Sequence, residues 1–225
     1  MTEAILVINP NSTAACTEAI DQALDPLRAP DGPEIDCLTL AEGPPGVETQ
    51  RHADQVIAPL CRLIERHDNR AGAFVIACFS DPGLHAARET TAKPVLGIAE
   101  SGLLTAMTLG ERVGIVSILG AAIPRHRRLI RALGIESRIA GDLALGLGVV
   151  ALADEARSWP RLVEVGAALR DEHGAEVLVL GCAGMARFRR RLEDALDLPV
   201  IDPSQAAVGM AISALRLGYR AAVQR

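Results

Sequence analysis

Short, almost purely apolar runs alternate with longer amphipathic segments along the whole chain. Apolar runs bounded by glycine, proline or polar residues are typical of buried parallel strands, and the segments between them are typical of helices that cover a sheet. The pattern therefore predicts an α/β protein built on parallel sheets. The predicted strands are residues 4–8, 35–40, 73–77, 95–98, 113–117, 177–181 and 200–201.

Several of the amphipathic segments begin with recognisable helix starts. Asp81 precedes Pro82 and Asp202 precedes Pro203, and an aspartate followed by proline is a favourable pair of N-cap and first helical residue. We therefore expect helices to begin at both places. The predicted helices include residues 13–27, 50–67, 82–91, 124–133, 155–173 and 205–217.

The chain also carries an internal repeat. Pro94-Val95 begins sixteen positions after Cys78, and Pro199-Val200 begins seventeen positions after Cys182. The number of positions between the end of the first predicted strand and Cys78 is similar to the number between the end of strand 113–117 and Cys182. The repeat predicts two half-copies, residues 1–97 and 98–203, followed by a helix. A pseudo-twofold axis between them would bring the two cysteine loops face to face across a cleft.

Cys78 and Cys182 each end an apolar run, where α/β sheets commonly place their chemistry. A strand-to-helix turn offers free N–H groups and the positive end of a helix, so we expect each thiolate to be stabilised there. A thiolate on one face of a carbon acid and a thiol on the other can invert the stereocentre through an enolate. Ser80 and Ser117 offer hydroxyl groups nearby. This pairing predicts a two-cysteine acid–base site.

Composition narrows the function classes. The net charge of −5 and the 2% aromatic content argue against nucleic-acid binding, which needs basic patches and stacking rings. No uncharged apolar stretch is long enough to span a membrane, and no export signal is recognisable at the N-terminus. The five cysteines show no metal-ligand spacing. We therefore expect a cytoplasmic protein with reduced thiols and no metal, whose partner is a small-molecule substrate.

Other chemically suggestive groups have simpler interpretations. Cys16, Cys37 and Cys61 are predicted to be small buried hydrophobic residues, and His85 to lie on a helix surface. The basic cluster 125–128 is expected to be a solvated helix face rather than an anion site. Residues 141–148 lack the spacing of a dinucleotide loop and are predicted to form a flexible loop near the cleft. The turn-rich segment 42–46 either closes over the cleft or is a plain surface loop.

Three motifs resemble those of hydantoin and allantoin racemases. They are Asn-Pro-Asn-Ser-Thr at 9–13, Cys-Phe-Ser-Asp-Pro-Gly at 78–83 with Ala-Arg-Glu at 87–89, and Gly-Cys-Ala-Gly-Met at 181–185. Together they span most of the chain. The resemblance extends to the wider aspartate/glutamate racemase superfamily.

This resemblance implies two flavodoxin-like lobes, residues 1–97 plus 204–225 and residues 98–203, with the final helix packing back on the first lobe. It implies a cofactor-independent racemase that uses Cys78 and Cys182, and such a pair of lobes is expected to form a homo-oligomer. The substrate-binding residues expected from the motifs and their surroundings are Asn9, Phe79, Ser80, Ser117, Ile118, Ala183 and Gly184.

The chain departs from related motifs at positions that bear on the substrate. Amino-acid racemases of the superfamily typically carry Asn-Thr after each catalytic cysteine, where this chain has Phe79-Ser80 and Ala183-Gly184. They also carry aspartate at the position of Asn9. These differences favour a neutral ring such as a 5-substituted hydantoin. Ile118, however, stands where hydantoin racemases often have a second threonine, which removes one possible hydrogen bond.

Three alternatives stay open on the sequence. The first is a racemase of aspartate or glutamate. The second is a decarboxylase or cis–trans isomerase of the same superfamily, in which one thiol is essential or the pair is used differently. The third is a non-catalytic module that binds a small molecule in the same cleft.

Overall fold

The computed structural model describes residues 4–221, which form two α/β lobes, each around a four-stranded parallel sheet. The first sheet has the order β2-β1-β3-β4, with β1 at Ala4–Asn9, β2 at Ile35–Thr39, β3 at Ala71–Ile76 and β4 at Val95–Gly97. Both faces of this sheet are covered, which explains why β1 and β3 are buried at every position.

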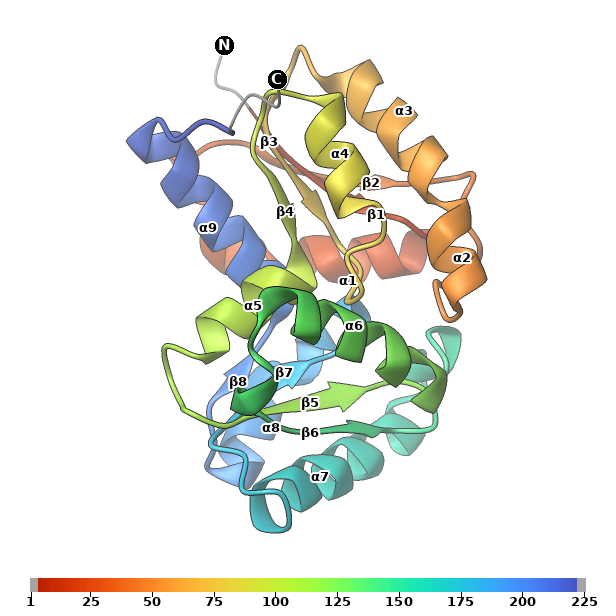
Figure 1. Ribbon diagram of the computed structural model, residues 1–225, viewed down its shortest axis with the longest axis vertical. Helices are drawn as coiled ribbons and strands as arrows, with labels where there is room; N and C mark the ends of the chain where they lie inside the picture. Colours follow the sequence, from red (N-terminus) through yellow and green to blue (C-terminus); the bar gives the residue numbers. More distant parts are fainter. Residues whose placement is uncertain (1–3, 222–225) are drawn as a thin grey trace.

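Helices cover the two faces of the first sheet with separate hydrophobic clusters (Figure 1). One face packs against α2 (Gln50–Gln55), α3 (Ile57–His67) and α4 (Leu84–Thr90). The other packs against α1 (Ala14–Ala23) and α9 (Pro203–Leu217). The last helix thus follows the second sheet in sequence but covers the first, where Gln205 Nε2 donates a hydrogen bond to the carbonyl oxygen of Ala23 at 2.7 Å.

The second sheet repeats the strand order of the first, as β6-β5-β7-β8. Its strands are β5 at Val113–Ser117, β6 at Ile139–Ala144, β7 at Val177–Leu180 and β8 at Val200–Ile201. One face packs against α7 (Glu155–Asp171) and α8 (Arg189–Leu196), and the other against α5 (Ile98–Ala106) and α6 (Ile123–Leu133). The short 3₁₀ helices are η1 (Asp25–Leu27), η2 (Gly120–Ala122), η3 (Glu136–Arg138), η4 (Val150–Ala153) and η5 (Ala183–Phe188).

Every strand expected from the apolar runs is present, but β6 was not predicted. The loop expected at 141–148 is wrong for its first half, because residues 139–144 pair in parallel with β5. This strand lies at the edge of the sheet, is only partly buried and includes Gly141 and Asp142. An edge strand with one solvated side does not need a continuous apolar run, so the pattern that identifies central strands misses it.

Of the two aspartates predicted to cap helices, one does so and one does not. Asp202 caps α9 as expected, because its Oδ1 accepts a hydrogen bond from Gln205 N at 2.7 Å. The N-cap role expected of Asp81 is wrong: α4 begins at Leu84 after Gly83, and Asp81 has a left-handed φ of 43°. Its carboxylate oxygens instead accept hydrogen bonds from Ala99 N and Glu100 N, in the first turn of α5.

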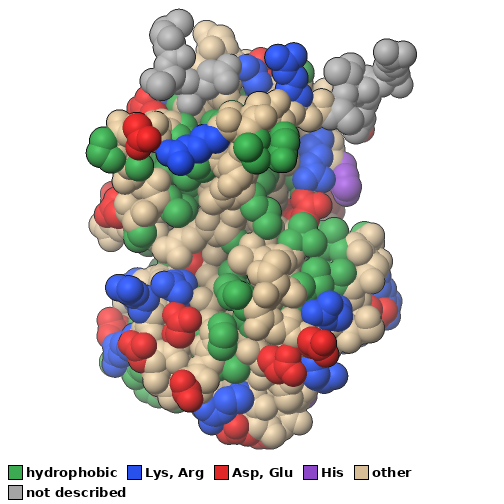
Figure 2. Space-filling model, turned by 90° about the vertical axis from the view of Figure 1, so that its left-hand side faces the viewer, with side chains coloured by type: hydrophobic (Ala, Val, Ile, Leu, Met, Phe, Trp, Pro, Cys, Tyr) green, Lys and Arg blue, Asp and Glu red, His purple; other side chains and the backbone are tan. Residues whose placement is uncertain are grey.

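The face formed by α5 and α9 crosses both lobes. Figure 2 shows the molecule from this side, with hydrophobic side chains reaching the surface near its middle. The large exposed hydrophobic residues on α5, on α9 and just after these helices are Leu104, Leu109, Leu217 and Tyr219. Among residues 4–221, no helix combines the length and apolar character that crossing a membrane requires.

Candidate active site

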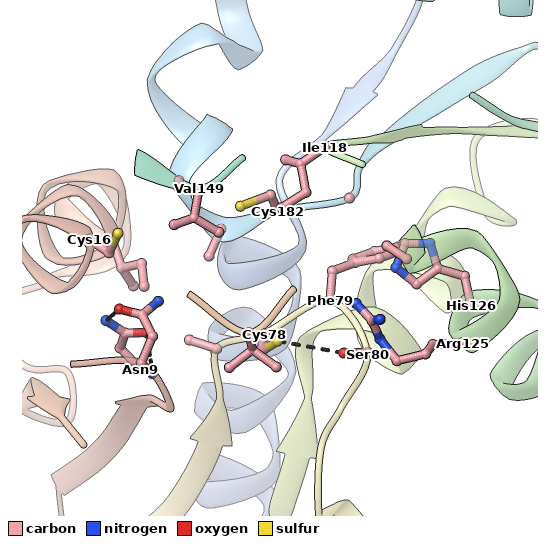
Figure 3. A pocket seen from close by; sticks show the side chains of 18 residues that line it. Asn9, Cys16, Cys78, Phe79, Ser80, Ile118, Arg125, His126, Val149 and Cys182 are labelled. Carbon is pink, nitrogen blue, oxygen red and sulfur yellow. Dashed lines mark hydrogen bonds between the residues drawn. The ribbon is translucent and has the colours of Figure 1, made fainter. Parts of the chain in front are cut away.

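A pocket lies between the two lobes at the carboxyl ends of central strands from both sheets (Figure 3). Asn9 ends β1, residues 77–80 follow β3, Ile118 follows β5, and residues 181–184 follow β7. Parallel α/β sheets place binding sites at this edge, because loops there can diverge around a ligand. The remaining lining residues are Asn11, Cys16, Ile20, Val47, Ala122, Arg125, His126 and Val149.

The structure brings together all but one of the predicted site residues. Cys78 and Cys182 line this pocket, together with Asn9, Phe79, Ser80, Ile118, Ala183 and Gly184. Ser117 does not line it. Its side chain is fully buried, and its hydroxyl is hydrogen-bonded to Asp142 Oδ1 and lies 3.2 Å from His126 Nδ1.

Cys78 lies in a tight turn after β3 rather than at the start of a helix. The amides of Ser80 and Asp81 donate hydrogen bonds to the Cys78 carbonyl oxygen at 2.8 and 3.0 Å, and α4 begins only at Leu84. The Cys78 sulfur lies 3.6 Å from the Ser80 hydroxyl oxygen. Stabilisation of this thiolate by the N-terminus of the following helix, as expected from the sequence, is therefore not available here.

Burial is the main influence on the Cys78 thiol and raises its pKa. The Ser80 hydroxyl and the Arg125 guanidinium act in the opposite direction, since each favours the thiolate. The nearby Asp81 carboxylate raises the pKa further, because a second negative charge disfavours ionisation. The Cys78 thiol thus lies in a largely buried site with one cation and one hydroxyl donor nearby.

Cys182 is the N-cap of η5, and its carbonyl oxygen accepts a hydrogen bond from Met185 N at 3.1 Å. Burial raises the pKa of this thiol to about 12, and the backbone N–H of Gly184 only partly offsets it. The negative charges of Cys78 and Cys16, when these thiols are ionised, and of Asp202 raise it further. The expected stabilisation of the Cys182 thiolate is therefore outweighed, and this thiol holds its proton near neutral pH.

The amide of Asn9 is used within the β1–α1 turn. Its Oδ1 accepts from Asn11 N at 3.1 Å, and its Nδ2 donates to Asn11 Oδ1 and Thr17 Oγ1 at 3.1 and 3.0 Å. Asn9 thereby orients Asn11, which also lines the pocket. The motif at 9–13 is thus part of the site, although the sequence interpretation assigned the substrate contact to its first residue and missed Asn11.

The prediction that the basic cluster 125–128 is a solvated helix face is wrong for Arg125 and His126. The two residues are 8% and 2% exposed and both line the pocket, whereas Arg127, Arg128 and Arg131 are exposed as predicted. A signal for this existed in the sequence. Arg125 and His126 lie four positions before Leu129 and Ile130, so they share the face of α6 that packs on the sheet.

A buried polar cluster positions this part of α6. His126 Nδ1 lies 2.9 Å from Asp142 Oδ2, so the unpredicted strand β6 supplies the carboxylate that holds the imidazole. The His126 ring meets the Phe79 ring edge-on, with centroids 5.1 Å apart. The cluster thereby links the second sheet to the loop that carries Cys78.

Of the remaining three cysteines and His85, only Cys16 lines the pocket. Cys16 is partly buried and lines the pocket, contrary to the expectation of an inert core residue, whereas Cys37 and Cys61 are partly buried elsewhere. His85 is exposed, as predicted. Within residues 4–221, no three His, Cys, Asp or Glu side chains are grouped so that they could hold a metal ion.

The sequence is similar to known racemases over nearly its whole length. The family model described as Asp/Glu/Hydantoin racemase matches residues 5–211. The hydantoin racemase of Paenarthrobacter aurescens is 39% identical over 219 residues, which cover 96% of this chain and 92% of that protein.

Solved structures of allantoin racemases have the same fold. The enzyme from Klebsiella pneumoniae superposes with a TM-score of 0.92 at 33% identity, covering 98% of this chain and 90% of that one. The enzyme from Pseudomonas fluorescens has a TM-score of 0.93 at 29% identity, covering 97% and 93%. Together with the sequence matches, these structures cover both lobes and the pocket between them.

Proposed function

Because the chain belongs to the Asp/Glu/hydantoin racemase family, we propose that it racemises a 5-substituted hydantoin or a similar ring carbon acid, with Cys78 and Cys182 as the acid–base pair. The observation that carries this proposal is that two thiols from equivalent strand ends of two sheets line one pocket. The similarity to a hydantoin racemase and to allantoin racemases supports the substrate class.

The proposed reaction moves one proton in each half. One cysteine, as thiolate, takes the proton from C5, so the C–H bond breaks, an S–H bond forms and the electron pair passes to the adjacent carbonyl oxygen. The other cysteine, as thiol, then protonates C5 from the opposite face, and its sulfur becomes the thiolate. Hydrogen-bond donors at the pocket must meet the enolate oxygen. The backbone N–H of Gly184 and the side chain of Asn11 are candidates.

The lining of the pocket fits a neutral ring better than a free acidic amino acid. Ile118, Val149 and Ala183 form apolar walls that fit the body of a ring, and Arg125 is the permanent cation among the lining residues. Ala183-Gly184 after the second cysteine provides no side-chain hydrogen bond for an α-carboxylate. These features support a compact ring whose polar edges meet backbone groups.

Solvent exchange tests the reaction and the substrate class together. L- and D-5-substituted hydantoins, allantoin, aspartate and glutamate are incubated separately with the protein in D₂O, and NMR and optical rotation follow each sample against a protein-free control. We expect deuterium at C5 and loss of optical activity for a hydantoin. Exchange confined to aspartate or glutamate, or CO₂ release from an arylmalonate in a parallel assay without any exchange of hydantoins, would contradict the proposal.

Cysteine variants test the mechanism. Cys78→Ser and Cys182→Ser should each reduce racemisation by at least ~10²-fold, because each removes one proton-transfer group. Cys61→Ser is the matched control, since Cys61 lies on α3 and does not line the pocket. Full racemase activity in either pocket variant would rule out the two-base mechanism.

A further inference from the structure

A buried guanidinium borders the turn that carries Cys78. Arg125 extends from α6 to the pocket, and Figure 3 shows its guanidinium beside Ser80, whose hydroxyl in turn contacts the Cys78 sulfur. Its Nη1 donates hydrogen bonds to the carbonyl oxygens of Glu48 and Ala121 at 3.0 and 3.1 Å. Its Nε is buried and has no hydrogen-bond partner in the described part of the chain.

This buried cation has no carboxylate partner among residues 4–221. The charged groups that act on it are the Cys78 thiolate, which favours the protonated guanidinium, and Arg128, which disfavours it. A buried charge is costly unless an opposite charge accompanies it. The group beside Arg125 that can supply a negative charge is the Cys78 sulfur.

Cys182 lacks such a partner. The charges acting on it come from Cys78, Cys16 and Asp202, and all of them disfavour its thiolate. Around Cys78, the titratable and charged groups are Arg125 and His126 on α6, Asp81 in its own turn, Cys16 on α1 and Cys182 after β7. Arg125 is the permanent cation of this set, and it acts on Cys78.

We propose that Arg125 is a positioning residue that makes Cys78, rather than Cys182, the first of the two thiols to ionise. The role deepens the proposed function and rests on it, because it decides which thiol begins the reaction. Once ionised, Cys78 removes the C5 proton, and Cys182 holds the proton that is delivered. The enantiomer whose C5–H bond points to Cys78 then reacts without a prior exchange of protons between the thiols.

Site-resolved alkylation tests this asymmetry without any substrate. The protein is treated with iodoacetamide from pH 6 to 10.5, and mass spectrometry gives the rate for Cys78 and Cys182 separately. We expect Cys78 to reach its half-maximal rate at a lower pH than Cys182. In Arg125→Gln, the Cys78 rate near pH 8 should fall about tenfold and its midpoint should rise by about one pH unit, with the Cys182 rate unchanged at each pH. Arg125→Lys should recover most of the wild-type profile.

Arg128→Gln is the matched control. Arg128 lies on the same helix and its Nη2 donates to Gln50 Oε1 across the two lobes, but it is exposed and does not line this pocket. Its variant should keep the wild-type profile of both thiols. Earlier ionisation of Cys182 in the wild type would overturn the proposal, even if Arg125→Gln failed to fold. An unmoved Cys78 midpoint in a folded Arg125→Gln variant would also overturn it.

The alkylation assay and the solvent-exchange assay can give negative results independently of each other. Ordered ionisation without racemisation of any hydantoin would reject the substrate proposal and leave the role of Arg125 intact. Racemisation without ordered ionisation would support the substrate proposal and reject the role of Arg125.

Discussion

Asp202 caps a helix with a buried carboxyl group, and this burial makes the stability of the protein depend on pH. Its Oδ1 accepts the capping hydrogen bond of α9, while its Oδ2 is buried without a hydrogen-bond partner in the described residues. Burial raises the pKa of Asp202 to about 6, above the value near 4 of an unfolded chain. Between these values the folded protein binds the extra proton, so the contribution of Asp202 to the free energy of unfolding falls as pH rises.

Asp202→Asn should therefore gain stability relative to the wild type as pH rises. Asparagine caps helices as well as aspartate does, and it carries no charge into the buried site. Urea unfolding at pH 4.5 and pH 8 should show a shift in favour of the variant of about 2 kcal/mol. Asp154→Asn is the matched control, because Asp154 caps α7 from an exposed position, and the gain at high pH should be confined to Asp202→Asn. A pH-independent difference for Asp202→Asn would contradict the prediction.

The basic cluster on α6 also belongs to the residue scale. Composition and charge predicted a solvated face, and this holds for three arginines but not for Arg125 and His126. Helical spacing alone identifies the buried face of α6. It does not say that a pocket and the Asp142 carboxylate lie beneath that face, and these are what make burial of the two residues possible.

At the scale of elements, the junction between β4 and α5 depends on a close approach of Asp81. A Cβ atom added to Gly97 would lie 2.2 Å from the carboxyl carbon of Asp81, which is held by two backbone amides of α5. The φ of Gly97 is −93°, so its backbone is available to any residue. The need for glycine here is therefore steric.

Gly97→Ala should lower the free energy of unfolding by several kcal/mol, roughly 3 or more, because the Asp81 carboxylate must move and leave buried amides unpaired. Gly209→Ala is the contrasting variant. Gly209 lies within α9, a Cβ there would meet nothing within 4 Å, and alanine should add roughly 0.5–1 kcal/mol. Denaturant unfolding of both variants checks the pair. Equal effects of the two substitutions would show that the contact with Asp81 does not govern this junction.

Strand prediction succeeded for every fully buried strand and failed for one partly buried edge strand. The central strands β1, β3, β5 and β7 are buried throughout and were all identified from their apolar runs. Edge strand β6 was missed, because its partly solvated face allows glycine and aspartate. The predicted helix 50–67 is interrupted at Val56, where α2 ends and α3 begins.

At the scale of the whole molecule, the two lobes are joined beside the pocket by the segment around Glu48. Its carbonyl oxygen accepts from Arg125 Nη1, and its Oε1 accepts from Val149 N at 2.9 Å. Val149 and Val47 both line the pocket. The segment after 42–46 and the turn after β6 therefore meet across the lobe boundary and close one side of the site.

Glu48→Ala should loosen this boundary. The Val149 amide loses its acceptor, so amide hydrogen exchange in residues 146–153 should accelerate about fivefold, as expected for a hydrogen bond worth about 1 kcal/mol. Glu42→Ala is the matched control, because Glu42 pairs with Arg62 within the first lobe at 2.7 Å. Mass spectrometry of exchange follows both variants. Unchanged protection of 146–153 in Glu48→Ala would show that other contacts hold the boundary.

The sequence by itself determined the two-sheet α/β architecture, the repeat and the pair of cysteines at equivalent strand ends, because buried strands and strand-end chemistry are written in local patterns. Only the tertiary structure decided that Asn11, Cys16 and Arg125 line the same pocket, and that Ser117 faces away from it toward His126 and Asp142. These assignments depend on contacts between residues far apart in the chain, such as Arg125 and Glu48. The periodicity of one segment reports which face is buried, but not which distant groups bury it.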